Sequence, residues 1–131
     1  MIGLDTNVVL RLLLNDAPEQ NARLDALFAE FGGEPESLLL TDVVLAEVIW
    51  TLRGAYRQDK AAQLVALRSL LGEPAFAFEN RTAVQHAVDL FDQVACGFAD
   101  CLVTAKHAQL GCGFTATFDR AMRKITGVRV L

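Results

Sequence analysis

The sequence predicts an α/β sandwich with a central, mainly parallel sheet flanked by helices. Short apolar segments alternate with longer segments whose apolar residues recur at helical spacing, a pattern typical of strands joined by helical crossovers. The chain has 131 residues, of which 53% are hydrophobic, and this size favours one domain with one core. We therefore expect a single domain over residues 1–131.

The N-terminal part of the sequence predicts one strand and two helices. Residues 1–4 are short and apolar, which predicts a strand that ends at Asp5. Residues 6–14 are apolar around a single arginine and predict a short helix. Asp16 is the candidate N-cap of the next helix, over residues 19–31, which two glycines end.

The middle of the sequence predicts a second strand and two more helices. The strand covers residues 37–41, and Thr41 or Asp42 caps a helix that runs to about residue 56. An amphipathic helix over about residues 59–71 follows and stops at a glycine.

The C-terminal part continues the same alternation. In order, the expected elements are a strand at residues 75–79, a helix that starts at Asn80 or Thr82 and runs to about residue 94, a helix at 98–110, a strand at 113–118, a helical turn at 119–125 and a final edge strand at 128–131.

Composition narrows the functional classes. The net charge of −4 disfavours binding of nucleic acid by bulk positive charge. No apolar run reaches the roughly 18 residues that a membrane span needs, and the N-terminus lacks the pattern of a secretory signal. The three cysteines lack CxxC spacing, so we interpret them as small buried residues of a cytoplasmic protein.

Four carboxylates stand as the only charged residues in their apolar stretches: Asp5, Glu47, Asp100 and Asp119. A lone buried carboxylate is costly unless it is paired, hydrogen-bonded or bound to a metal. Four such acids that converge would form a site for Mg²⁺ or Mn²⁺, which prefer oxygen ligands. Ions of this kind act on phosphate esters by polarising oxygens and activating water.

The predicted elements place these acids at the ends of strands or on helices. Asp5 and Asp119 follow strands, at the edge of a parallel sheet where ligand sites form. Asp100 falls in the first turn of a helix, and Glu47 lies on a helix without a charged partner. Three of the acids also have a plain alternative, since Asp5 and Asp119 could simply cap helices and Asp100 could satisfy a helix dipole.

The chain resembles the PIN-domain family, and within it the VapC-type toxins of bacterial toxin–antitoxin pairs. The segments that carry the resemblance, in order, are Leu4-Asp5-Thr6-Asn7-Val8, Ala46-Glu47-Val48, Phe98-Ala99-Asp100 and Thr117-Phe118-Asp119. The resemblance implies a PIN-like three-layer sandwich and a Mg²⁺- or Mn²⁺-dependent endoribonuclease. It also implies a homodimer and a small antitoxin partner. The helix that ends near residue 56 has more apolar surface than one buried face needs, which would suit dimer or antitoxin contact, although this helix could equally be buried on two sides.

By position in the family pattern, Asp5 and Asp100 would be the principal metal ligands. Glu47 would bind metal or orient the attacking water, and Asp119 would complete a second metal position. Asn7 and Thr117 match supporting polar positions, although the Thr117 hydroxyl could equally be satisfied locally. Candidate contacts to the RNA backbone are Arg11, Arg53, Arg120, Arg123 and Lys124.

Two other readings remain open from the sequence. A phospho-accepting receiver domain has a similar length and class, but it needs a pair of acids after the first strand, where Asp5 stands alone. A PIN-like nuclease acting on DNA, or in RNA processing without a toxin role, would use the same acids, because carboxylates and metal do not distinguish the sugar.

Overall fold

The computed structural model describes residues 1–131 and divides into two compact units, Met1–Glu79 and Asn80–Leu131. Each unit alternates helices with strands, and every strand pair is parallel. The predicted α/β class with mainly parallel pairing is therefore confirmed. The expectation of one domain over residues 1–131 stays a prediction.

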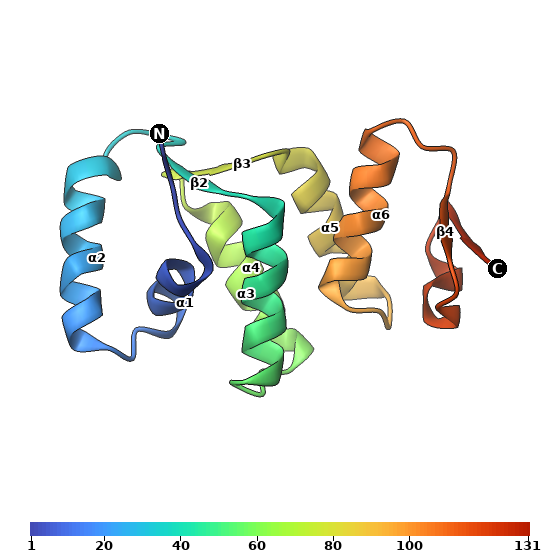
Figure 1. Ribbon diagram of the computed structural model, residues 1–131, viewed down its shortest axis with the longest axis horizontal. Helices are drawn as coiled ribbons and strands as arrows, with labels where there is room; N and C mark the ends of the chain where they lie inside the picture. The colour runs from blue at the N-terminus through green and yellow to red at the C-terminus, as the bar shows by residue number, and fades with distance from the viewer. The chain divides into compact units, whose positions relative to one another are not determined.

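The first unit is built on a three-stranded parallel sheet in the order β1-β2-β3 (Figure 1). Leu38 of the central strand pairs with Ile2 on one side and with Phe76 on the other. The elements in order are β1 (Ile2–Gly3), α1 (Thr6–Leu14), α2 (Pro18–Phe31), β2 (Leu38–Leu40), α3 (Asp42–Gly54), α4 (Lys60–Gly72) and β3 (Phe76–Phe78).

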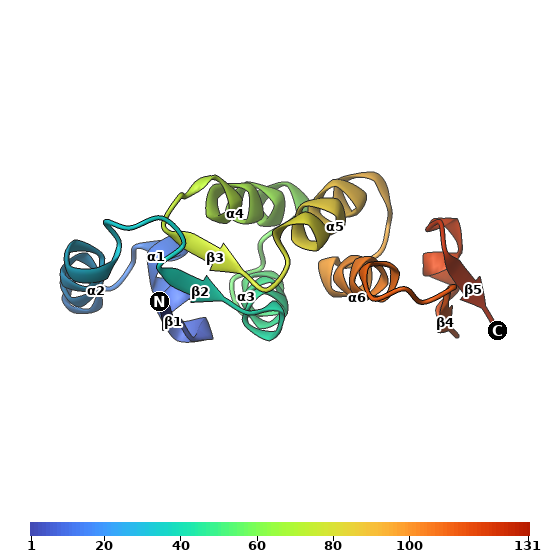
Figure 2. The ribbon, with the colours of Figure 1, turned by 90° about the horizontal axis from the view of Figure 1, so that it is seen from above.

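The core of this unit lies around β2 and the helices that follow β1 and β2. Leu38 and Leu40 of β2 are fully buried, and both point to the same face of the sheet because side chains alternate along a strand. α1 packs against α3 and α2 against α1, so α2 lies beside α1 on the side away from α3 (Figures 1 and 2). This packing fixes the first turn of α1, which follows Asp5, against the body of the unit.

Local capping signals explain most helix starts. Thr41, Asp59 and Asn80 each accept a backbone N–H three residues ahead, as N-caps do. The prediction that Asp16 caps the second helix is wrong: the N-cap is Ala17, without a side-chain hydrogen bond. Asp16 instead binds the guanidinium of Arg11 at 2.6 Å, so its carboxylate is already committed to an ion pair.

The second unit contains two packed helices and a two-stranded parallel sheet. Its elements are α5 (Arg81–Gln93), α6 (Phe98–Gln109), β4 (Thr115–Thr117), the 3₁₀ helix η1 (Arg120–Lys124) and β5 (Val128–Val130). α5 and α6 lie side by side (Figure 1), and the rings of Phe91 and Phe98 meet edge to face with centroids 6.0 Å apart. Gly127 has a φ of +83° before β5, a conformation that favours glycine.

A small apolar cluster anchors η1 within this unit. Cys96, Met122 and Ile125 are each buried and pack together. The thiol of Cys96 also donates a hydrogen bond to the carbonyl of Ala121 at 3.0 Å. Because Cys96 directly precedes the N-cap of α6, this contact ties the start of α6 to η1.

The helices of this protein are all too short or too polar to cross a membrane.

Candidate functional site

Asp5 stands at the carboxyl end of β1 and is the N-cap of α1. Its Oδ1 accepts a hydrogen bond from the backbone N–H of Val8 at 3.1 Å. The carboxylate is exposed, and Oδ2 takes no part in the cap. Asp5 therefore begins the helix, as the plain alternative expects, and also presents an oxygen that a cation could bind.

Glu47 lies in α3, which begins directly after β2. Its side chain is exposed, whereas Val48 and Ile49 next to it are buried. The backbone carbonyl of Glu47 accepts a hydrogen bond from the Thr51 hydroxyl at 2.8 Å. Glu47 thus belongs to the same unit as Asp5, on a helix that packs against the helix Asp5 begins.

Asp100 lies in the first turn of α6, where the N-cap Gly97 provides no side-chain hydrogen bond. Oδ2 of Asp100 lies 3.9 Å from the position that a Cβ at Gly97 would take, so the carboxylate turns back over the start of the helix. The helix dipole favours negative charge there. Thr104 donates a hydrogen bond to the Asp100 carbonyl at 2.9 Å, which holds the backbone and leaves the carboxylate unused.

Asp119 follows β4 and caps η1. Its Oδ1 accepts a hydrogen bond from the backbone N–H of Ala121 at 2.9 Å. The hydroxyl of Thr117 accepts from the backbone N–H of Asp119 at 3.0 Å. Thr117 thereby positions the Asp119 backbone through a local contact, and no contact of its hydroxyl with the Asp119 carboxylate is formed.

The four acids are distributed over the two units. Asp5 and Glu47 belong to the first unit, and Asp100 and Asp119 belong to the second. Although each stands in an apolar stretch of the sequence, three of these carboxylates are exposed and Asp100 is half-buried. No group of three or more His, Cys, Asp or Glu side chains is arranged to hold a metal ion, so a centre that uses all four acids stays a prediction.

Arg11 is already engaged within the first unit. Its guanidinium donates to Oδ1 of Asp16 at 2.6 Å and to the hydroxyl of Tyr56 at 2.7 Å. The hydrogen bond to Tyr56, reinforced by the charge of Asp16, raises the pKa of Arg11. Arg11 also lines a small pocket of about 200 Å³ with Asn7, which is exposed in the first turn of α1.

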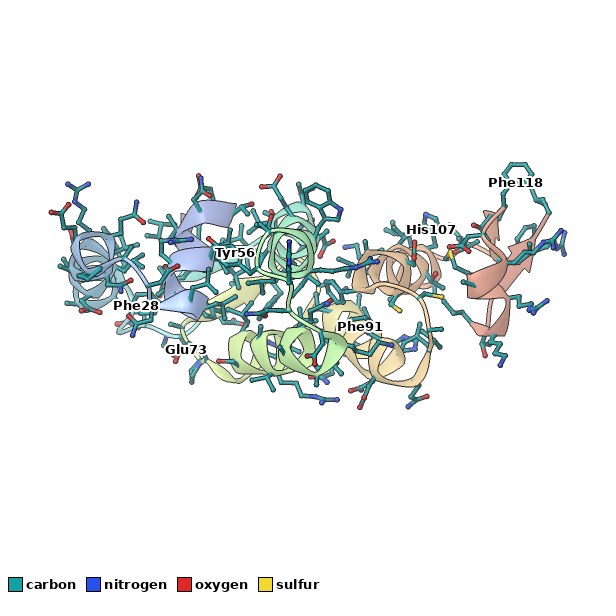
Figure 3. The ribbon with its side chains drawn as sticks, turned by 90° about the horizontal axis from the view of Figure 1, so that it is seen from below. Phe28, Tyr56, Glu73, Phe91, His107 and Phe118 are labelled. Carbon is teal, nitrogen blue, oxygen red and sulfur yellow. The ribbon has the colours of Figure 1, made fainter.

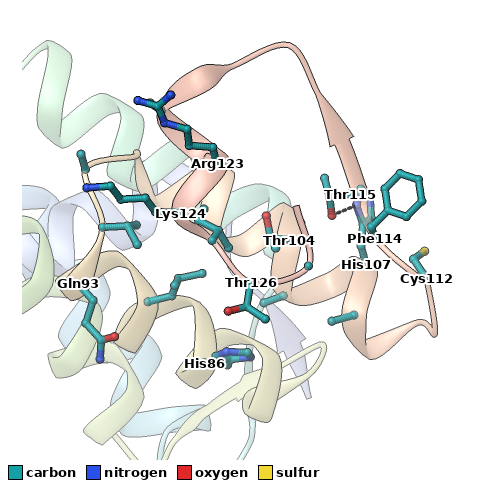
Figure 4. A pocket seen from close by; sticks show the side chains of 18 of the residues that line it. His86, Gln93, Thr104, His107, Cys112, Phe114, Thr115, Arg123, Lys124 and Thr126 are labelled. Carbon is teal, nitrogen blue, oxygen red and sulfur yellow. Dashed lines mark hydrogen bonds between the residues drawn. The ribbon is translucent and has the colours of Figure 1, made fainter. Parts of the chain in front are cut away.

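The other arginine and lysine candidates on η1 share a larger pocket within the second unit. This pocket has a volume of about 970 Å³, and Arg120, Arg123 and Lys124 line it. Arg123 and Lys124 lie on one side, whereas His107 and Thr115, joined by a hydrogen bond of 2.9 Å, lie on the other (Figure 4). None of the four acids lines this pocket, so it supplies positive charge near η1 without being the acidic site itself.

Sequence reasoning overlooked the role of Glu79, which follows β3. Its Oε1 accepts a hydrogen bond from the backbone N–H of Asp42 at 2.8 Å, at the start of α3. The two residues are far apart in sequence, so no local signal could have predicted this contact. The prediction that the cysteines are buried is confirmed for Cys96 and Cys101 and wrong for Cys112, which is exposed.

Parallel strands that are followed by a carboxylate and then a helix define an α/β protein with candidate ligands at its strand ends. The family model for the PIN domain matches residues 2–128, and the chain belongs to the PIN-domain family. This membership excludes the receiver alternative.

A curated relative and a solved structure were also found. The relative is a VapC ribonuclease from Aquifex aeolicus, 24% identical over 122 residues, which cover 93% of this chain and 90% of the relative. The structure is a toxin–antitoxin complex from Klebsiella pneumoniae, with a TM-score of 0.37 and 16% identity over 99% of this chain and 97% of that one.

Proposed function

We propose that this PIN-domain protein is a Mg²⁺- or Mn²⁺-dependent endoribonuclease that hydrolyses RNA phosphodiester bonds. In this proposal Asp5, Glu47, Asp100 and Asp119 are the metal-binding acids. The observation that carries it is a repeated arrangement: Asp5 and Asp119 each end a parallel strand and cap the following helix with one carboxylate oxygen. The PIN-domain match and the VapC ribonuclease relative support the assignment.

The donor set fits a hard divalent cation. Capping occupies Oδ1 of Asp5 and of Asp119, so the same hydrogen bond that fixes each side chain leaves Oδ2 for a ligand. The carboxylates of Glu47 and Asp100 are exposed or half-buried. Oxygen ligands without Cys or His are the set that Mg²⁺ and Mn²⁺ prefer.

When bound, such ions supply Lewis acidity to the phosphate and lower the pKa of water for attack. The chain's own residues perform the remaining tasks. Asp5 and Asp100 would be the principal metal ligands, Glu47 would bind metal or orient the attacking water, and Asp119 would complete the second metal position. The Thr117 hydroxyl holds the backbone of Asp119, which limits the orientations open to that carboxylate.

Cleavage of RNA by variants with altered acids tests this proposal. Asp5→Asn and Asp100→Asn should each lose activity by on the order of 100-fold or more, because they remove charge from the metal-binding set. EDTA should abolish cleavage, and added Mg²⁺ or Mn²⁺ should restore it. Undiminished cleavage by both variants in metal-containing buffer contradicts the assignment. The same assay with DNA of identical sequence decides whether the sugar matters.

We further propose that the nuclease acts in the cytoplasm as the toxin of a toxin–antitoxin pair, as a homodimer that a small antitoxin holds in check. The segments that resemble VapC-type toxins and the VapC ribonuclease relative support this role. Expression of the wild-type chain should arrest growth, and Asp5→Asn should not. Equal growth of both strains at equal protein levels points instead to a PIN nuclease in RNA processing. Light scattering of the purified protein tests the dimer.

A further inference from the structure

A charged hydrogen bond joins α1 of the first unit to the chain at the end of α3. Nη2 of Arg11 donates to the hydroxyl of Tyr56 at 2.7 Å, and Nη1 donates to Oδ1 of Asp16 at 2.6 Å. Tyr56 follows α3, and Figure 3 shows it between the ribbons of α1 and α3. Because each partner binds a different nitrogen of the planar guanidinium, the Arg11 side chain is held in one orientation.

The two helices that this contact joins each carry a proposed metal ligand. Asp5 caps α1, and Glu47 lies in α3. The two helices pack together, and their buried side chains are all apolar: Val9, Leu10, Leu45, Val48, Ile49 and Leu52. Apolar packing is non-directional, whereas a hydrogen bond from a charged group has a defined geometry. The Arg11–Tyr56 contact is therefore suited to fix the position of α1 relative to α3.

Further hydrogen bonds connect Tyr56 with Glu47. The backbone N–H of Tyr56 donates to the carbonyl of Thr51 at 3.4 Å. The hydroxyl of Thr51 in turn donates to the carbonyl of Glu47 at 2.8 Å. Arg11 is thus connected to Glu47 through Tyr56 and Thr51, and to Asp5 through the turns of α1.

We propose that Arg11 and Tyr56 are positioning residues that fix Asp5 relative to Glu47 and so raise the affinity of the site for its divalent cation. Residues that orient metal ligands from outside the ligand set commonly influence metal affinity in this way. This inference rests on the proposed nuclease function and adds residues that touch neither the metal nor the RNA. It assigns Arg11 a role within the protein instead of a contact with the RNA backbone.

Binding of Mn²⁺, followed by EPR in the absence of RNA, tests the positioning role without any turnover. Tyr56→Phe removes the hydroxyl and keeps the ring, and it should raise the Kd for Mn²⁺ roughly 10-fold. Arg11→Lys should have a similar effect, because an ammonium group lacks the fork that reaches both partners. The double variant should bind no more weakly than either single variant, since the two residues act as one unit.

Asp59→Ala is the matched control for a general loss of stability in the same unit. Asp59 accepts the backbone N–H of Ala62 at 2.9 Å and caps α4, so its replacement destabilises a helix start without altering the contact between α1 and α3. This variant should bind Mn²⁺ like the wild type. In cleavage assays, excess Mn²⁺ should restore most of kcat to Tyr56→Phe, with KM for RNA unchanged. A loss caused only by unfolding would persist at saturating Mn²⁺ and would also affect Asp59→Ala.

The outcomes distinguish this inference from the proposed function. If cleavage depends on metal but Tyr56→Phe and Arg11→Lys bind Mn²⁺ like Asp59→Ala, the positioning role is wrong and the nuclease assignment stands. If Arg11→Lys raises KM for RNA and keeps the Mn²⁺ affinity, Arg11 contacts RNA and the inference is overturned. If both variants weaken Mn²⁺ binding but the wild type cleaves no RNA, the positioning role stands and the nuclease assignment is wrong. A wild-type protein that binds no Mn²⁺ contradicts both.

Discussion

The hydroxyl of Thr117 accepts a hydrogen bond from the backbone N–H of Asp119 at 3.0 Å, and it donates to Sδ of Met122 at 3.6 Å. One side chain at the end of β4 thus fixes both the residue that caps η1 and the residue that anchors η1 in the apolar cluster. The orientation of the Asp119 carboxylate depends on a short local network, and this network can be altered without changing the acid.

Replacing Thr117 with valine should remove both hydrogen bonds and keep the shape of the side chain. We expect a loss of about 1 kcal/mol in the free energy of unfolding. Cleavage should also need a higher Mg²⁺ concentration to reach half of its maximal rate, because Asp119 would be less well positioned. Thr117→Ser keeps the hydroxyl and should retain both properties. Urea unfolding and a metal titration of activity measure these effects. Equal behaviour of the two variants would show that the hydroxyl has no positioning role.

Asp5 has a capping role and a proposed metal-binding role, and two substitutions separate them. Asn is as good an N-cap as Asp, so Asp5→Asn should keep the stability of the protein while cleavage is lost. Asp5→Ala should lose cleavage and also about 1 kcal/mol of stability, because the N–H of Val8 loses its acceptor. Thermal or urea unfolding of the two variants, beside the RNA assay, measures the difference. A stable, active Asp5→Asn protein contradicts the ligand role.

Cys96→Ala should loosen the attachment of η1. The thiol is buried and donates to the carbonyl of Ala121, so we expect a loss of roughly 1–2 kcal/mol in the free energy of unfolding. Cys112→Ala is the control, since Cys112 is exposed and its replacement should change stability by less than about 0.5 kcal/mol. Similar losses in both variants would argue against a specific role of Cys96.

The proposed RNA contacts should differ in their response to salt. A cation that binds a phosphate of single-stranded RNA contributes roughly 0.7 to the slope of log K against log salt concentration. Arg123→Gln should reduce this slope, because Arg123 is exposed at the η1 pocket. Arg11→Gln should leave it nearly unchanged, because Arg11 is engaged by Asp16 and Tyr56. Binding isotherms at several salt concentrations, in EDTA, test both expectations. If only Arg11→Gln reduces the slope, Arg11 and not Arg123 contacts a phosphate.

The sequence was informative wherever the deciding interaction is local. Thr41, Asp59 and Asn80 were expected near helix starts, and each caps its helix by bonding a backbone N–H three residues ahead. A strand needs only a short apolar segment with turn signals around it, so the order of elements was also predictable. Asp16 was the exception, because Arg11 draws its carboxylate into an ion pair.

For the candidate site, the sequence determined which acids stand without charged neighbours and which of them end strands. That much follows from charge spacing and from helix capping, which act over a few residues. Only the tertiary structure decided their exposure, the engagement of Arg11 by the distant Tyr56 and of Asp42 by Glu79, and the exposure of Trp50 and Phe118. These properties depend on which segments pack together, and packing joins residues whose separation along the chain carries no local signal.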